Sequence, residues 1–221
     1  MKKIIAVVGA KGKMGSVVCD ALKDSFCVVK IDKNDKLTNH KYFDLVIDFA
    51  SAESSVQSAK FCLEKQVPLI VGSTGQTQDE ISEIKKVASV APLVISANFS
   101  IGIMILKYLI KKMTQFCTFF EDVVIFEKHH KLKKDAPSGT AKEIQKMIFD
   151  HYKTDTNVIC ERGGKEVGTH LIDFYLEDEV FSIEHRAFSR KAFADGVKLV
   201  ALNIFEKEKG VYEFADFVKN E

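Results

Sequence analysis

Fifteen consecutive residues near the middle of the chain combine groups that transfer protons with groups that bind anions. The stretch Glu127–Ala141 contains two adjacent histidines, several closely spaced lysines and a Pro-Ser-Gly-Thr turn. A histidine exchanges a proton near neutral pH, and a lysine holds an anionic group as a point charge. The turn directly precedes a helical pattern, so its N–H groups and hydroxyls would lie at a helix N-terminus, where a carboxylate or phosphate binds well. A basic, solvated loop with a helix cap is the simpler alternative.

A glycine-rich turn near the N-terminus predicts a second anion-binding site. Gly9, Gly12 and Gly15 are three residues apart, follow a short β-branched run and open a helical pattern. Glycines let the backbone approach a pyrophosphate, whose charge suits a helix N-terminus. The spacing departs from G-x-G-x-x-G because Lys11 occupies the middle glycine position. A tight strand–helix turn would explain the three glycines as well, but Lys11 and Lys13 could both reach phosphate.

The pair Asp32-Lys33 lies at the end of the second predicted strand. An acid at this place binds the hydroxyls of the adenosine ribose and favours NAD, whereas a basic residue accommodates the 2′-phosphate of NADP. A solvated turn explains Lys33 equally well. Both NADH and NADPH therefore remain candidate cofactors.

Strands and helices alternate through the first half of the chain. The apolar runs predict strands at 3–8, 26–31, 45–49, 68–71 and 93–96, with helices at 16–23, 51–65 and 77–89. This alternation predicts an α/β fold with a Rossmann-like, doubly wound parallel sheet. Ligands of such sheets bind beyond the carboxyl ends of the strands, where the glycine turn and the acid–base pair lie.

The pattern changes after residue 103. Helical patterns cover 103–116 and 139–152, and strands are predicted at 122–126, 158–162, 170–176 and 180–185. Consecutive strands indicate an antiparallel or mixed sheet with one face available, within a smaller α+β domain. A helix at 190–205 is expected to return to the first domain. Residues 1–100 and 190–221 would form a dinucleotide-binding domain, and 101–189 a domain for substrate binding and oligomerisation.

Composition and charge exclude several classes of protein. The chain has 221 residues, 46% hydrophobic and 29% charged, as is typical of a globular domain. A formal net charge of +1 gives no sign of a nucleic-acid or membrane partner, and no apolar stretch is long enough to span a bilayer. Five cysteines without a C-x-x-C pair are typical of a reduced, cytoplasmic protein. No third ligand stands at helical spacing from the two histidines, so no metal site is expected.

Taken together, the motifs resemble those of the 4-hydroxy-tetrahydrodipicolinate reductase family, historically called dihydrodipicolinate reductase. The resemblance rests on Glu127–Ala141, on the Gly-x-x-Gly-x-Met-Gly turn, and on the segments Gly72-Ser-Thr-Gly75, Ser96-Ala-Asn-Phe99 and Phe193-Ala194-x-Gly196. It covers nearly the whole chain. It implies reduction, with NADH or NADPH, of a cyclic imine carrying two carboxylates in the diaminopimelate route to lysine. It also implies a homotetramer assembled through the sheet of the second domain.

The same resemblance implies roles for individual residues. His129 would be the proton donor, and Lys133 would assist it and bind substrate. A substrate carboxylate would be bound by the neighbouring residues His130, Ser138, Gly139 and Thr140. The cofactor would contact the glycine turn, the acid–base pair and two further turns, which comprise Gly9, Ala10, Lys11, Gly12, Lys13, Met14, Gly15, Asp32, Lys33, Gly72, Ser73, Thr74, Ser96, Ala97, Asn98 and Phe99. His170, His185 and Arg190 would be structural or lie behind the site.

Two other functions remain open at this point. One is a different two-domain dehydrogenase, acting on an amino-acid semialdehyde or on a diaminopimelate. An acylating semialdehyde dehydrogenase needs a nucleophilic cysteine at a domain junction, and none of the five cysteines is convincingly placed. The other is a regulatory dinucleotide-binding protein that kept the fold and lost the chemistry. Such a protein would lack the proton donor and the carboxylate site, and this chain carries both motifs.

Overall fold

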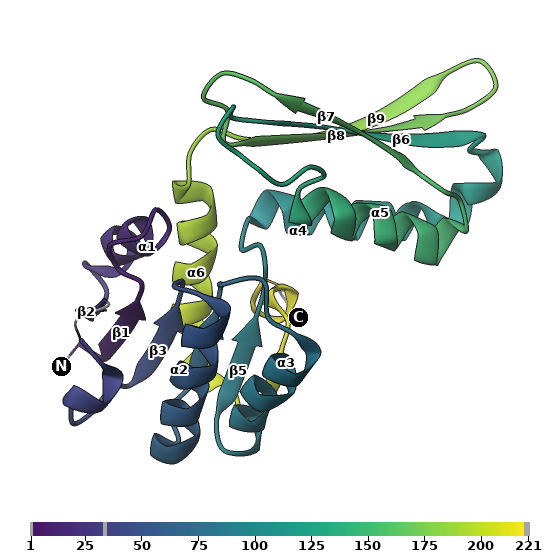
Figure 1. Ribbon diagram of the computed structural model, residues 1–221. Coiled ribbons are helices and arrows are strands. Elements are labelled where there is room, and N and C mark those ends of the chain that lie inside the picture. Colours follow the sequence, from purple (N-terminus) through teal and green to yellow (C-terminus); the bar gives the residue numbers. More distant parts are fainter. Residues whose placement is uncertain (1, 33–34, 219–221) are drawn as a thin grey trace. The chain divides into compact units, whose positions relative to one another are not determined.

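Two compact units make up the chain in this computed structural model, which describes residues 2–32 and 35–218. The first unit combines the N-terminal segment up to Phe99 with the C-terminal segment from Phe193, and the second unit is Ser100–Ala192. Each unit has its own sheet (Figure 1). Among the described residues, no helix has both the length and the apolar character needed to cross a membrane.

The sheet of the first unit is parallel throughout, with strand order β10-β5-β4-β3-β1-β2. Its strands are β1 (Ile4–Val8), β2 (Cys27–Ile31), β3 (Leu45–Asp48), β4 (Leu69–Val71), β5 (Pro92–Ile95) and β10 (Gly210–Tyr212). The helices are α1 (Gly15–Leu22), α2 (Ala52–Lys65), α3 (Gln78–Lys85) and α6 (Lys191–Asn203). The predicted doubly wound parallel sheet is confirmed. The edge strand β10 was not predicted.

The strand order reverses between β1 and β3. The chain passes from β1 outward to β2 and then returns to the other side of β1 with β3. In such sheets a ligand crevice opens beyond the carboxyl ends of the strands at the reversal. Gly9, directly after β1, has φ +78°, and a Cβ there would lie 2.9 Å from the Ala50 backbone after β3. Only glycine allows this close approach of the two turns.

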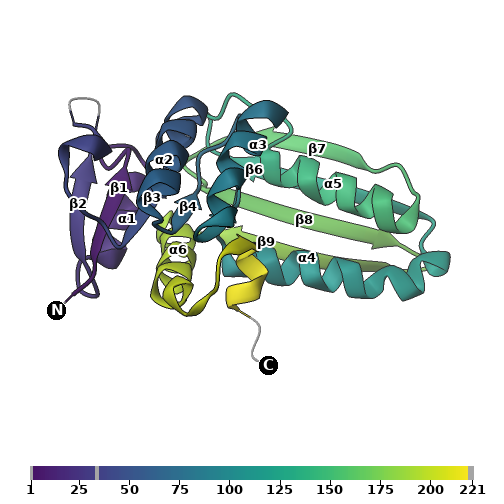
Figure 2. The same ribbon diagram turned by 90° about the horizontal axis from the view of Figure 1, so that it is seen from below.

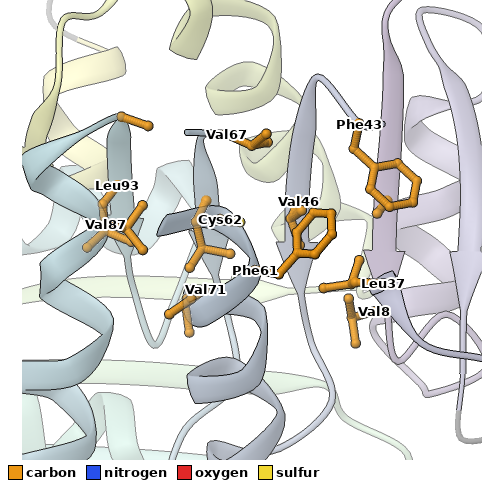
Figure 3. Close-up of a cluster of buried hydrophobic side chains, with 14 of the residues drawn as sticks. Val8, Leu37, Phe43, Val46, Phe61, Cys62, Val67, Val71, Val87 and Leu93 are labelled. Carbon is orange, nitrogen blue, oxygen red and sulfur yellow. The ribbon is translucent and has the colours of Figure 1, made fainter. Parts of the chain in front are cut away.

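Buried apolar side chains of the central strands meet α2 and the segment after α3. Figure 3 shows Phe61 and Cys62 of α2 among Val46, Val71 and Leu93 of three neighbouring strands. A strand that is buried on both faces has a continuous run of apolar residues in its sequence, and this is why the positions of these strands could be predicted. The predicted cap of α2 is also confirmed, because the Ser51 hydroxyl accepts a hydrogen bond from the Ser54 N–H at 3.1 Å.

The second unit contains a mixed sheet of order β7-β6-β8-β9. The strands are β6 (Asp122–His129), β7 (Asn157–Arg162), β8 (Gly168–Tyr175) and β9 (Val180–Ala187), and the helices are α4 (Ile101–Met113) and α5 (Gly139–Tyr152). β6 runs parallel to β7 and antiparallel to β8, and β9 runs antiparallel to β8. The predicted mixed sheet is therefore confirmed. Both helices lie along the same face of the sheet (Figures 1 and 2).

Strand β6 is longer than predicted, and the extension changes the setting of the histidine stretch. The prediction ended at residue 126, but β6 continues to His129. Val123, Ile125, Glu127 and His129 are all buried, so the same alternation runs on with ionisable side chains. The predicted strand ended too early because the alternation of apolar residues stops where the inward-facing residues become polar.

We expect Gly196→Ala to destabilise the first unit. A Cβ on Gly196 of α6 would lie 1.9 Å from the Phe99 carbonyl oxygen, a backbone atom that no rotamer change can move. The expected loss is about 1–3 kcal/mol in the free energy of unfolding, the usual result of overpacking, measured by urea denaturation. Gly139→Ala is the matched control, because no described atom lies within 4 Å of the added methyl group. Equal stability of the two variants would contradict this account of α6 packing.

Candidate functional site

His129 is the last residue of β6, and its backbone is held on both sides. Because β7 and β8 flank β6, the loop that joins them crosses the end of this strand. The Gly163 N–H donates to the His129 carbonyl at 2.9 Å, and the His130 N–H donates to the Glu166 carbonyl at 2.8 Å. The His129 side chain is 9% exposed. A Cβ on Gly168 would lie 2.9 Å from its Nε2, so the glycine makes room for the ring.

A fully buried carboxylate, Glu127, lies two residues before His129 on the same face of β6. Its Oε1 accepts from Arg162 Nη2 at 2.6 Å and from the Ser138 N–H at 3.0 Å. Its Oε2 lies 3.5 Å from His129 Nδ1. Burial is the largest influence on the Glu127 pKa and raises it, but hydrogen bonds from Ser138 and Arg162 outweigh burial and lower the pKa to about 2. The carboxylate is therefore charged at neutral pH.

The N-terminus of α5 lies beside this carboxylate. Ser138 is the N-cap, and its hydroxyl accepts from the Ala141 N–H at 3.1 Å. The first turn of α5 carries no acidic residue. Gly139 is exposed, and apart from its chain neighbours and its own helix backbone no described atom lies within 4 Å of the place of a Cβ, so packing does not require a glycine there. Thr140, which follows, is half-buried. This open helix N-terminus can accept an anion.

Lys133 belongs to a turn that folds back beside His129. Its N–H donates to the His130 carbonyl at 3.0 Å, and its Nζ lies 2.8 Å from Asp135 Oδ2. His130 is half-buried, and within the described residues its Nδ1 is buried without a hydrogen-bond partner. The structure thus brings His129, His130, Lys133 and the start of α5 to one end of the second sheet.

Burial lowers the pKa of His129. The Glu127 carboxylate opposes that effect, while the positive charges of Lys133 and Arg162 add to it. A protonated imidazole in this setting is a strong acid that gives up its proton readily. A bound dianion would add negative charge near the ring and raise the pKa again, which couples protonation of His129 to ligand binding.

Two further histidines continue a polar row across the sheet. His170 of β8 lies opposite Glu127, and His185 of β9 lies opposite His170. Their Nε2 atoms lie 3.3 Å from the Ser138 hydroxyl and 3.2 Å from the Ser100 hydroxyl, the N-caps of α5 and α4. Burial lowers the pKa of both, that of His170 to about 3, so both rings are neutral at neutral pH. They hold the two helix starts without adding charge.

Three of these side chains have the chemistry of metal ligands. Candidate ligand atoms of Glu127, His129 and His170 lie within 4.8 Å of one another, a set that includes only one of the two adjacent histidines considered in the sequence. Arg162 is hydrogen-bonded to the same carboxylate at 2.6 Å. Its charge already compensates Glu127 and would repel a divalent cation. We therefore interpret the group as a hydrogen-bonded, proton-carrying cluster.

The glycine turn lines a cleft of about 1330 Å³ in the first unit. Gly9, Lys11, Gly12 and Asp32 line it, together with residues that follow β3. The Lys11 N–H donates to Asp32 Oδ1 at 3.1 Å, so the acid also fixes the turn. Of the described side chains, none caps α1 at Met14, and the first turn of α1 has no acid. The cleft lies at the reversal of strand order, as expected for a dinucleotide.

The other predicted cofactor residues divide into three groups. Ala10, Lys13 and Gly15 belong to the same turn, and a Cβ on Gly15 would lie 2.1 Å from the Gly9 carbonyl oxygen. Two groups follow β4 and β5 rather than lining the cleft, namely Gly72, Ser73 and Thr74, and Ser96, Ala97, Asn98 and Phe99. Phe99 is buried and its ring contacts two other phenylalanine rings, so its side chain belongs to the core. Lys33 lies outside the described residues.

Several residues that build the two sites were not singled out from the sequence. Asp48, buried at the end of β3, accepts from the Ala50 N–H at 3.0 Å and from the Ser54 and Ser58 hydroxyls at 2.8 and 2.7 Å, which ties the start of α2 to the edge of the cleft. The sequence signal that could have identified Asp48 is an acidic residue inside an apolar run. Arg162 is the second such residue, and it gave no local signal.

Comparisons with known proteins agree across the whole chain. Residues 3–99 match the family model described as dihydrodipicolinate reductase, N-terminus, and residues 102–218 match its C-terminus. The 4-hydroxy-tetrahydrodipicolinate reductase of Rickettsia bellii is 34% identical over 98% of this chain and 94% of its own length. The protein of the same name from Thermosipho africanus is 33% identical over 96% of both chains.

Solved structures show the same fold. A dipicolinate-bound dihydrodipicolinate reductase from Paenisporosarcina superposes with a TM-score of 0.77 at 21% identity, covering 96% of this chain and 98% of the other. A probable dehydrogenase from Thermotoga maritima gives a TM-score of 0.66 at 10% identity, covering 97% and 92%. With both halves of the sequence matched, the chain belongs to the dihydrodipicolinate reductase family.

Proposed function

We propose that the chain reduces 4-hydroxy-tetrahydrodipicolinate to tetrahydrodipicolinate with NADH or NADPH, in the diaminopimelate route to lysine. The observation that carries the proposal is the convergence of His129, Lys133 and the open N-terminus of α5 at one end of the second sheet. A proton carrier, a cation and an anion-binding helix start are what reduction of a dicarboxylate imine requires. Relatives named for this activity, at about a third identity, support it.

In the proposed reaction the substrate loses its 4-hydroxyl group as water, which leaves a ring double bond conjugated with the imine. A cofactor bound in the first unit would then supply a hydride to the conjugated ring carbon. His129 donates the proton that completes the reduction, and Lys133 keeps the surrounding potential positive. His130, Ser138, Gly139 and Thr140 bind a substrate carboxylate through backbone N–H groups and side chains at the start of α5. The substrate's negative charge raises the pKa of His129 from its lowered value, so the donor is protonated when the substrate is in place.

The two units take different parts in this proposal. The first, with the cleft beside Gly9 and Asp32, binds the dinucleotide through the turns at its strand ends, and residues 101–189 bind substrate. We also propose a homotetramer that forms through the second sheet. Ile159 and Val180 are about half exposed on the face of that sheet turned away from α4 and α5, and such apolar area supports association of subunits.

The direct test couples the purified protein to a dihydrodipicolinate synthase that supplies fresh substrate. We expect the absorbance of NADH and NADPH to fall only when the synthase is present. The ratio of the two rates would show which cofactor the Asp32-Lys33 pair selects. Cofactor binding without oxidation of either cofactor would contradict the proposed reaction and favour the regulatory alternative.

Replacing the proton donor and its neighbour should separate chemistry from cofactor binding. His129→Gln with Lys133→Ala should lower kcat by roughly 10²–10⁴-fold or more, because a general acid contributes that much. The Kd for NADH, measured by fluorescence titration, should stay nearly unchanged, because both residues belong to the second unit. Lys134→Ala, an exposed neighbour, is the control and should behave as wild type. Loss of NADH binding in the double variant would mean that the two sites have been confused.

A methyl group on Gly139 should block the carboxylate site without disturbing the fold. The position is open and its backbone φ is not positive, so Gly139→Ala should leave stability unchanged or slightly increased. Because an anion must approach the first N–H groups of α5, KM for the dicarboxylate substrate should rise several-fold while KM for the cofactor stays constant. An unchanged substrate KM would place the carboxylate elsewhere.

A further inference from the structure

Glu127 has an unused charged oxygen beside the proton donor. Its side chain is fully buried, and Oε1 already accepts from Arg162 and from the Ser138 N–H. Among the described residues, Oε2 has no hydrogen-bond partner. A buried carboxylate oxygen without a donor is costly, so the position of the nearest donor matters.

Two histidine rings lie beside this oxygen, and His129 is the nearer, because His170 Nε2 lies 3.9 Å away. His129 Nδ1 lies 3.5 Å from Glu127 Oε2 and likewise has no hydrogen-bond partner among the described residues. A shift of a few tenths of an ångström would bring the two atoms to ordinary hydrogen-bond distance. The opposite ring nitrogen, Nε2, lies beside Gly168, where a side chain would come within 2.9 Å of it and block it. The ring therefore has one nitrogen for the carboxylate and one for a reacting group.

We propose that Glu127 is the positioning residue of the proton-donating step. Its carboxylate binds the Nδ1–H of His129 and so assigns the transferred proton to Nε2. Through its other oxygen it holds the Ser138 N–H, and so fixes the start of α5 that binds the substrate carboxylate. This inference rests on the proposed reductase function, and it adds a residue that ties the proton donor to the anion-binding site.

Arg162 extends the same link to the loop before α5. Its Nη2 donates to Glu127 Oε1 and to the Asp135 carbonyl, both at 2.6 Å. Glu127 thereby connects β6, β7 and the loop that carries Lys133. A change at this carboxylate would alter both the orientation of the donor and the distance between the donor and the carboxylate site.

The charges around His129 predict the direction in which its pKa changes when Glu127 is replaced. Glu127 on β6 and Asp135 in the loop raise the pKa of His129, Arg162 on β7 and Lys133 in the loop lower it, and His170 on β8 is neutral. Glu127→Gln removes the nearest negative charge while keeping size and an oxygen acceptor. The pKa of His129 should then fall further. The donor must be protonated to act, so activity falls as the pH rises above the pKa of His129. In the variant this fall should occur at a lower pH than in wild type.

The test compares Glu127→Gln with Glu161→Gln, the same change at an exposed residue of β7 that pairs with Lys128. We expect Glu127→Gln to lower kcat on the order of 10²-fold, within the range of general acid–base groups, and to move the high-pH limb of kcat to lower pH. KM for the cofactor should not change. Glu161→Gln should leave both the rate and the pH profile as in wild type.

A second measurement does not depend on turnover. In protein with ¹⁵N-labelled histidine, NMR titration should give a lower pKa for His129 in Glu127→Gln than in wild type or Glu161→Gln. An unchanged His129 pKa, or a slower enzyme with an unchanged pH profile and reduced thermal stability, would overturn the positioning role and leave Glu127 a structural residue. If wild type itself oxidises neither cofactor, the proposed function fails, while the titration still decides whether Glu127 and His129 are coupled.

Discussion

The burial of one negative charge, the Glu127 carboxylate, is the constraint on which the second unit depends. Moving a carboxylate out of water costs several kcal/mol unless cations and hydrogen bonds compensate. Here the compensation comes from Arg162 on β7 and from the Ser138 N–H at the start of α5, residues 35 and 11 positions away in the sequence. The position of the helix start relative to the sheet is thereby set by the need to satisfy a buried charge. Shape complementarity among apolar side chains alone would allow more than one register.

Neutral groups complete this arrangement, and their neutrality matters for function. His170 and His185 bind the N-cap serines of α5 and α4 while burial keeps both rings uncharged at neutral pH. The helix starts therefore keep their partial positive charge. Lys133 adds a full positive charge in the same region. Acidic side chains in place of the two histidines would add negative charge there and weaken this positive potential.

Sequence reasoning succeeded where a structural signal is local. The helix 139–152 was predicted with its observed limits because the Pro-Ser-Gly-Thr turn and the helical spacing mark both ends. It failed where the signal is non-local. Arg162 joins the site only because β7 pairs in parallel with β6, and no local pattern encodes that register. The edge strand β10 has three residues, of which Gly210 has φ +157°, too short and too irregular for a periodic pattern.

Close packing requires some glycines of this chain, but it does not require Gly139. Gly15, Gly168 and Gly196 stand where a methyl group would meet other atoms at 2.1, 2.9 and 1.9 Å, so packing alone accounts for them. Gly139 stands at the start of a 14-residue helix, where a glycine lowers helix stability and nothing described lies within 4 Å. The fold gains nothing from a glycine there. The absence of a side chain at this position leaves the backbone N–H groups of α5 open to close approach by an anion, and the buried carboxylate behind them keeps those groups beside His129.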